Sequence, residues 1–132
     1  MAGQETTLQL PLVLIVEDDE NLLGGIIDIL TMDGFCRVIG ARHGKEAIEF
    51  MSEETPALII SDIIMPQMDG LELLTLIRSD PELGHIPFLI LSARNQQRDI
   101  NTGIAMGADD YIIKPFTPQG LIDTVSRVLG NR

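Results

Sequence analysis

The chain has 132 residues, 45% of them hydrophobic, which is enough for one domain with a single core. Its 9 basic and 20 acidic residues give a formal net charge of -11, which opposes attraction to nucleic acid or anionic lipid. No apolar run approaches the ~20 residues of a membrane span, and the N-terminus lacks the pattern of a secretory signal. We therefore expect a cytoplasmic protein that binds neither nucleic acid nor membranes directly.

Strand-like and helix-like segments alternate along the chain after a polar stretch, residues 1–10, that we predict to be a flexible tail. One domain is predicted over 11–132. Nearly continuous apolar runs, typical of strands covered on both faces, occupy 12–16, 57–61 and 87–91. Weaker strand candidates lie at 35–40 and 110–114. Apolar spacing and stop signals favour helices at 20–34, 44–54, 69–80, 98–108 and 121–129.

This alternation predicts an α/β fold built from βαβ units. Right-handed crossovers wind such units into an open, doubly wound parallel sheet with helices on both faces. We expect five strands in the order 2-1-3-4-5 and five helices, the flavodoxin-like arrangement. In such a sheet the ligand site lies beyond the carboxyl ends of the strands, between strands 1 and 3.

Carboxylates follow two strands that this order makes neighbours. The first predicted strand ends in EDDE, residues 17–20, and the third ends in Asp62. Like charges at one edge repel, and a hard divalent cation such as Mg²⁺, which prefers oxygen ligands, relieves the repulsion. Acids after a strand also cap helices. Asp19 and Glu20 fit capping alone, whereas both interpretations stay open for Glu17 and Asp18.

The last two predicted strands end in other groups that phosphate chemistry uses. Ser92 supplies a hydroxyl in LSARN, and Lys114 supplies an ammonium in KPF. Phosphoryl transfer depends on positioning and on neutralising charge, and an aspartate can accept the phosphoryl group as an acyl phosphate. Taken together, these strand ends predict a phosphoryl-transfer site.

Four motifs in order, LIVEDDEN, ISDIIMPQMDG, LSAR and GADDYIIKPF, give the chain a close resemblance to the receiver domains of two-component response regulators. The resemblance runs from about residue 12 to residue 129. It implies that Asp62 accepts a phosphoryl group, with Asp18 and Asp62 as Mg²⁺ ligands. The backbone carbonyl of Ile64 would be a third ligand, and Glu17 would act mainly through bound water.

The resemblance also assigns roles on the far side of the cleft. The Ser92 hydroxyl and the Lys114 ammonium would each bind a phosphoryl oxygen, and the Lys114–Pro115 peptide bond would be cis. Tyr111 matches the family's switch aromatic, although a half-buried strand aromatic is the alternative. The output face implied spans residues 94–129.

As a member of such a family the protein would be a phosphorylation-dependent switch of a phosphorelay and not an enzyme, except that it assists its own Mg²⁺-dependent phosphorylation and dephosphorylation. The phosphodonor would be a phosphohistidine on a sensor histidine kinase or phosphotransfer protein, or a small molecule. A downstream protein or output domain would respond. The protein would be a monomer or a weak dimer through the 94–129 face.

Single features of the sequence distinguish this function from others. A flavodoxin-like cofactor binder needs a glycine- and hydroxyl-rich phosphate loop where EDDE stands, and an aspartyl phosphatase typically needs a second acid at position 64, which is Ile64. A scaffolding pseudo-receiver would lack one of the site groups. Gly24–Gly25, inside a predicted helix, fits either the close approach of a partner or a tolerated weakness. The aliphatic Ile64 offers no polar group to an attacking water, so we expect a long-lived phosphorylated form.

Overall fold

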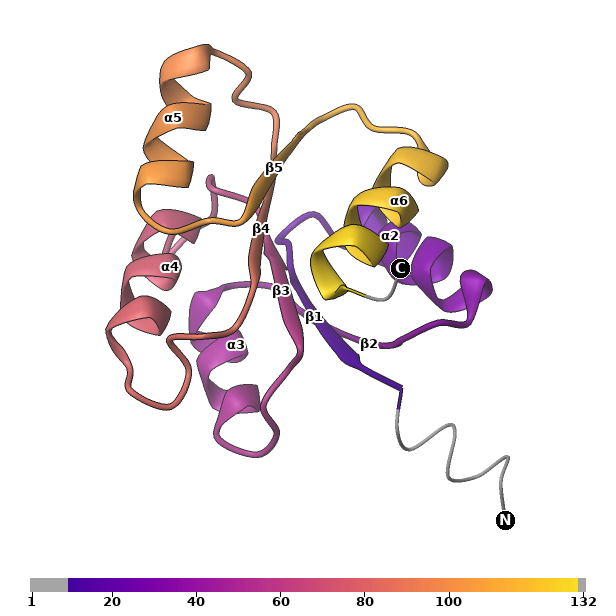
Figure 1. Ribbon diagram of the computed structural model, residues 1–132, viewed down its shortest axis with the longest axis horizontal. Coiled ribbons are helices and arrows are strands. Elements are labelled where there is room, and N and C mark those ends of the chain that lie inside the picture. Colours follow the sequence, from indigo (N-terminus) through magenta and orange to yellow (C-terminus); the bar gives the residue numbers. More distant parts are fainter. Residues whose placement is uncertain (1–9, 131–132) are drawn as a thin grey trace.

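The computed structural model describes residues 10–130 and shows a five-stranded parallel sheet between two layers of helices (Figure 1). The strand order is β2-β1-β3-β4-β5, as predicted. The strands are β1 (Leu12–Val16), β2 (Arg37–Ala41), β3 (Leu58–Ser61), β4 (Phe88–Ser92) and β5 (Asp110–Ile113). Every residue of the three central strands is buried, which explains why their sequences are continuous apolar runs.

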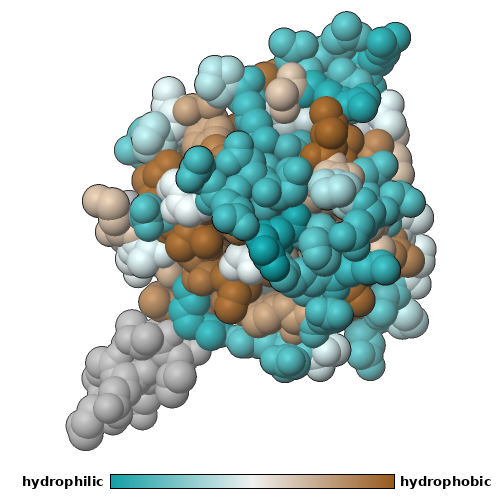
Figure 2. Space-filling model, turned by 180° about the vertical axis from the view of Figure 1, so that it is seen from behind, coloured by the Kyte–Doolittle hydropathy of each residue, from teal (hydrophilic) through white to brown (hydrophobic). Residues whose placement is uncertain are grey.

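Two layers of helices cover the sheet, with α2 and α6 on one face and α3, α4 and α5 on the other (Figure 1). The helices are α2 (Glu20–Asp33), α3 (Gly44–Met51), α4 (Gly70–Ser79), α5 (Gln97–Ala105) and α6 (Pro118–Leu129). Alternate strand residues face each layer: Leu14 and Val16 pack toward α3 and α4, and Val13 and Ile15 toward α2 and α6. The outer surface is largely hydrophilic, with separate hydrophobic patches (Figure 2).

Most predicted boundaries shift by one to three residues. Strand β2 begins at Arg37 rather than at residue 35, because Gly34, at φ 78°, ends α2 and the chain then turns into the strand. Helix α6 begins at Pro118 rather than at residue 121, since proline suits the first turn and Thr117 caps it through Gly120 N–H. Helix α5 ends at Ala105, two residues before Gly107.

Other sequence-based expectations have mixed outcomes. Cys36 is buried. An added Cβ at Gly24 or Gly25 would meet no atom within 4 Å, so no neighbouring backbone of residues 10–130 approaches the pair. The predicted tail lies outside the described residues except for Leu10. None of the helices in the described part of the chain is long and apolar enough to cross a membrane.

Candidate functional site

The carboxyl ends of four strands meet at one edge of the sheet and carry the predicted site residues. Backbone pairing continues one residue beyond three of these strands, which places the first site residue of each. Glu17 N–H donates to the Ala41 carbonyl at 2.9 Å, and Asp62 N–H to the Val16 carbonyl at 3.2 Å. Lys114 N–H donates to the Ser92 carbonyl at 2.8 Å.

Three carboxylates gather at this edge, as the predicted strand order requires. Glu17, Asp18 and Asp62 each offer an oxygen within 4.8 Å of the others. Glu17 and Asp62 are buried, at 2% and 7% exposure, whereas Asp18 is exposed to solvent. The set combines two fixed, shielded acids with one acid that an incoming ion or ligand can reach.

Lys114 bridges the two buried acids. Its Nζ lies 2.6 Å from Asp62 Oδ2 and 2.9 Å from Glu17 Oε1. The peptide bond between Lys114 and Pro115 is cis, as the resemblance implies. The contact with Glu17 was not predicted, because these residues are 97 positions apart and the sequence carries no signal for the side-chain conformation that joins them.

The protonation of this group follows from burial and pairing. Burial raises the pKa of Glu17, and hydrogen bonds from Lys114 and from Asp19 N–H offset the effect only in part. Burial alone would lower the pKa of Lys114, but its hydrogen bonds to Asp62 and Glu17 outweigh that effect and raise it. The ammonium therefore stays charged, and it pairs with two of the three acids.

Hydrogen bonds in the loop after β3 hold Asp62 in place. Asp62 Oδ1 accepts a hydrogen bond from Ile64 N–H at 3.2 Å, and Gly70 N–H donates to the Ile63 carbonyl at 2.9 Å. A Cβ on Gly70 would lie 2.0 Å from the Asp62 carbonyl oxygen. The Asp69–Gly70 pair therefore does more than begin a helix: the glycine lets α4 start directly against the backbone of the central acid.

Ser92 and Tyr111 both bond to the backbone of one residue, Arg94, on the other side of the cleft. Ser92 is fully buried. Its Oγ accepts a hydrogen bond from Arg94 N–H at 3.2 Å, while the Tyr111 hydroxyl donates to the Arg94 carbonyl at 2.8 Å. Burial raises the pKa of Tyr111, and a hydrogen bond with Ser92 lowers it by less. The backbone of residue 94 links the predicted hydroxyl to the predicted switch aromatic, a connection the sequence did not indicate.

Three acids outside the cluster have structural partners. Asp19 caps α2 through the N–H groups of Asn21 and Leu22, as expected. Asp109 and Asp110, which lie outside the acidic cluster, form ion pairs with arginines of α4 and α6.

The two histidines lie apart from this chemistry. His43 accepts a hydrogen bond from Glu46 N–H through Nδ1 and so caps α3. His85 is exposed. His43 thus has a structural role, and His85 lies at the surface.

The donor set fits a small divalent cation. Carboxylate oxygens on a fixed edge, with one exposed acid, match the preference of Mg²⁺ for one or two carboxylates, phosphate oxygens and retained waters. The side chain at position 64 is aliphatic and 53% exposed, so the second acid of an aspartyl phosphatase is missing. The arrangement can support phosphoryl transfer to Asp62 with charge neutralised by Lys114 and a metal ion.

Comparisons with known proteins agree with this geometry. Residues 13–126 match the response regulator receiver domain family. The chain is 38% identical to histidine kinase P4 of Formosa agariphila over 91% of the chain and 9% of that protein. It is 36% identical to the transcriptional regulatory protein PrrA of Mycobacterium tuberculosis over 97% of the chain and 54% of that protein. The whole length of such relatives therefore extends well beyond the matched region.

A solved structure resembles the fold over nearly its full length. A response regulator structure from Chloroflexus aurantiacus superimposes with a TM-score of 0.87, at 31% sequence identity, over 92% of this chain and 99% of that one. The predicted fold class is confirmed. Since several relatives are called transcriptional regulators, the expectation of no nucleic acid binding has no support for a longer protein that contains such a chain.

Proposed function

We propose that Asp62 is the phosphoryl-accepting residue of this chain, which belongs to the response regulator receiver domain family. Its relatives are two-component response regulators, and the chain is a signalling domain of that kind. One observation carries the assignment. Asp62 is a buried carboxylate at the end of a central strand with an ammonium 2.6 Å away and two further acids close by.

The reaction transfers a phosphoryl group from a nitrogen or oxygen atom of the donor to a carboxylate oxygen of Asp62. A carboxylate oxygen of Asp62 attacks the phosphorus of the donor and forms a P–O bond, giving an acyl phosphate. The bond from phosphorus to the donor nitrogen or oxygen breaks, and the leaving group keeps its electron pair. Lys114, already against Asp62, would neutralise charge on the phosphoryl group, and the Ser92 hydroxyl would donate to one of its oxygens.

Glu17, Asp18, Asp62 and the Ile64 carbonyl would hold Mg²⁺. The ion supplies positive charge that offsets the repulsion between carboxylates and phosphoryl oxygens. The support on this chain is the excess of acid: the cluster holds three carboxylates, and Lys114 pairs with two of them, Glu17 and Asp62.

Family membership suggests both the phosphodonor and the surface that responds to phosphorylation. The donor is a phosphohistidine of a sensor histidine kinase or phosphotransfer protein, and the face formed by residues 94–129 changes on phosphorylation. The Ser92 and Tyr111 hydrogen bonds to the backbone of residue 94 support this direction, because they join the site to the start of that face. A partner protein or an output domain reads the change, and weak dimerisation through the same face is the proposed oligomeric form.

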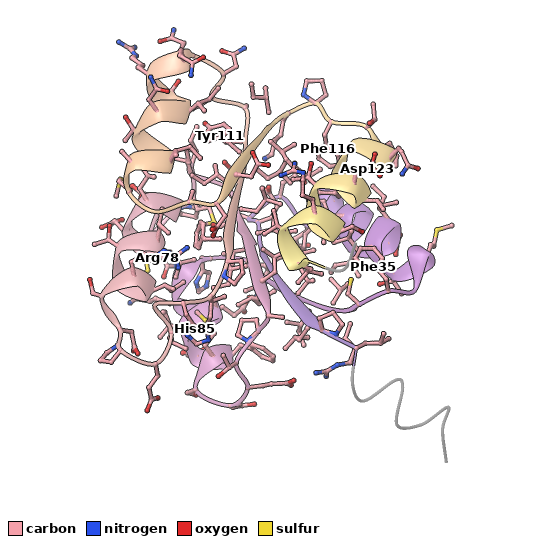
Figure 3. All side chains as sticks on the ribbon, viewed as in Figure 1. Phe35, Arg78, His85, Tyr111, Phe116 and Asp123 are labelled. Atoms are coloured by element: carbon pink, nitrogen blue, oxygen red, sulfur yellow. The ribbon has the colours of Figure 1, made fainter. Side chains whose placement is uncertain are left out.

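The test is modification by a small phosphodonor. The protein is incubated with acetyl phosphate and Mg²⁺, and intact mass is measured, with beryllofluoride binding as a second assay. We expect the wild-type protein to gain one phosphoryl group and Asp62→Asn to gain none. Asp123→Asn, on α6 (Figure 3), is the control and should be modified as the wild type is.

Two results contradict the proposal. One is a wild-type protein that does not gain a phosphoryl group with either acetyl phosphate or a phosphohistidine donor. The other is equal modification of wild type and Asp62→Asn. Modification that is unchanged when EDTA removes Mg²⁺ would contradict the metal assignment alone.

A further inference from the structure

Helix α5 rests on the sheet through a residue with no side chain. Gly103 is the one buried residue of this helix. Four of its neighbours, Gln97, Arg98, Asn101 and Thr102, are exposed polar residues, and hydrophilic residues cover much of the surface in Figure 2. With so little apolar side chain to anchor the helix, its distance from the sheet is set by what lies beneath Gly103.

Beneath Gly103 lies a cross-strand pair. Ile90 of β4 and Tyr111 of β5 are partners in the strand register, and Figure 3 places Tyr111 between β5 and α5. A Cβ on Gly103 would lie 2.5 Å from Ile90 Cδ1, and 3.5 and 3.6 Å from two carbons of the Tyr111 ring. The first distance is an overlap, whereas the other two are ordinary van der Waals contacts.

The Tyr111 ring is thus confined from two directions. Helix α5 passes one side of the ring at a distance that a Cβ on Gly103 would just close, and the hydroxyl donates to the Arg94 carbonyl at 2.8 Å. Arg94 N–H in turn donates to Ser92 Oγ. A ring that left this position would lose its hydrogen bond to Arg94.

We infer that Gly103 is a positioning residue of the switch: its missing side chain lets α5 settle on Ile90 and hold the Tyr111 ring against the loop that begins at Arg94. The signalling consequence rests on the proposed function of Asp62. A side chain at position 103 overlaps Ile90 Cδ1, and a helix α5 that lifts to relieve this overlap uncovers the ring. Phosphoryl chemistry at Asp62 does not need this contact, so the two can be separated.

The chain offers a direct optical probe of the inference. Its single tyrosine is Tyr111, and it contains no tryptophan, so tyrosine fluorescence reports on this ring alone. Acrylamide quenching is compared for wild type, Gly103→Ala, Ile90→Val and the double variant. Gly24→Ala is the matched control, because it makes the same change in a helix where an added Cβ meets nothing.

We expect the quenching constant of Gly103→Ala to rise by about twofold, since a half-buried ring opens to solvent. Valine lacks Cδ1, the atom that an alanine Cβ would strike, so the double variant should return to the wild-type value. Ile90→Val and Gly24→Ala should both match wild type. Equal quenching of wild type and Gly103→Ala, or no recovery in the double variant, overturns the inference.

A second measurement tests the link to signalling. Beryllofluoride with Mg²⁺ should change the quenching constant of wild type, and Gly103→Ala should lose that response while acetyl phosphate still modifies it to the wild-type extent. A modified wild type with unchanged quenching overturns the signalling role. If the wild type takes up no phosphoryl group at all, the proposed function fails, whereas the quenching comparison without donor still decides the role of Gly103.

Discussion

Gly70 is the glycine at which an added side chain would overlap its surroundings most severely. An added Cβ would lie 2.0 Å from the Asp62 carbonyl oxygen and 2.9 Å from the Ile63 Cα, and backbone atoms cannot move aside as a flexible side chain can. We expect Gly70→Ala to lower the free energy of unfolding by about 3 kcal/mol, measured by urea denaturation.

The control for Gly70 is a glycine without neighbours. Gly24→Ala adds a methyl group where no atom lies within 4 Å, so it should raise the free energy of unfolding by about 1 kcal/mol through helix propensity. If both alanine variants were equally stable, the close approach of α4 to Asp62 would not constrain the loop. Loss of kinase-dependent phosphorylation in Gly24→Ala, with acetyl phosphate still effective, would identify the glycine pair as a docking point.

The side chain of Ile64 leads to a prediction for how long the phosphorylated form lasts. Its side chain is 53% exposed beside Asp62 and has no group that could orient an attacking water. We expect the acyl phosphate to last minutes or longer, and Ile64→Asn to hydrolyse about tenfold faster, the effect of one hydrogen bond in the transition state. The decay of phosphorylated protein in Mg²⁺ measures this. Leu76→Asn, at an exposed site on α4, is the control; a wild-type half-life of seconds contradicts the prediction.

Glu17 makes stability depend on pH in a direction that can be checked. Burial raises its pKa above 4.5, so the folded state binds this proton more tightly than the unfolded state does. The associated stability is complete below pH 4.5 and is lost as pH rises through the folded pKa. We expect Glu17→Gln to raise the free energy of unfolding at neutral pH, and this gain to vanish in acid.

The measurement for Glu17 is urea denaturation across pH in EDTA, so that no metal ion contributes. Glu49→Gln, at an exposed position of α3, should show no such dependence. A less stable Glu17→Gln protein at neutral pH would mean that the ion pair with Lys114 outweighs the cost of burying the carboxylate.

At the scale of elements, Arg78 ties the end of α4 to the starts of two strands. Its guanidinium donates to the carbonyls of Gly84, Ile86 and Gly107 at 2.6 to 3.2 Å, and it pairs with Asp109. Removing it leaves these half-buried carbonyls without a donor. We expect Arg78→Ala to lower the free energy of unfolding by about 2–3 kcal/mol.

Arg127→Ala is the control for Arg78, because the ion pair joins an exposed arginine to the half-buried Asp110. Such pairs contribute about 0.5 kcal/mol. Urea denaturation of both variants separates the two cases. Equal losses would mean that the backbone contacts of Arg78 add nothing beyond a surface ion pair.

For the whole molecule, the positions of the strands and helices and the order of the strands could be predicted from the sequence. Strands β1, β3 and β4 are buried on both faces and so show continuous apolar runs, whereas β2 and β5 lie at the sheet edges and gave weaker signals. The connection rules for βαβ units then supplied the order. The strand order in turn brought the acids of β1 and β3 to one edge, as observed.

The features that escaped prediction are contacts between distant segments. Lys114 reaches Glu17, α4 begins against Asp62, and Gly103 lies over Ile90. Hydrophobic periodicity reports which face of a segment is buried, but it carries no information on rotamers or on how closely two backbones approach. The starts of α6 and β2 were misplaced for a related reason, since turns and caps are decided by a few local bonds.

The backbone pairing that continues past the strands has a consequence for amide exchange in deuterated solvent. The N–H groups of Glu17 and Asp62 are bonded to carbonyls of neighbouring strands, so they should exchange as slowly as the protein unfolds globally. The N–H groups of Ile64 and Arg94 are bonded only to side chains and should exchange through local opening. The two buried acids of the site would thus belong to the slowest-exchanging class, and the residues proposed to adjust around a phosphoryl group to a fast one.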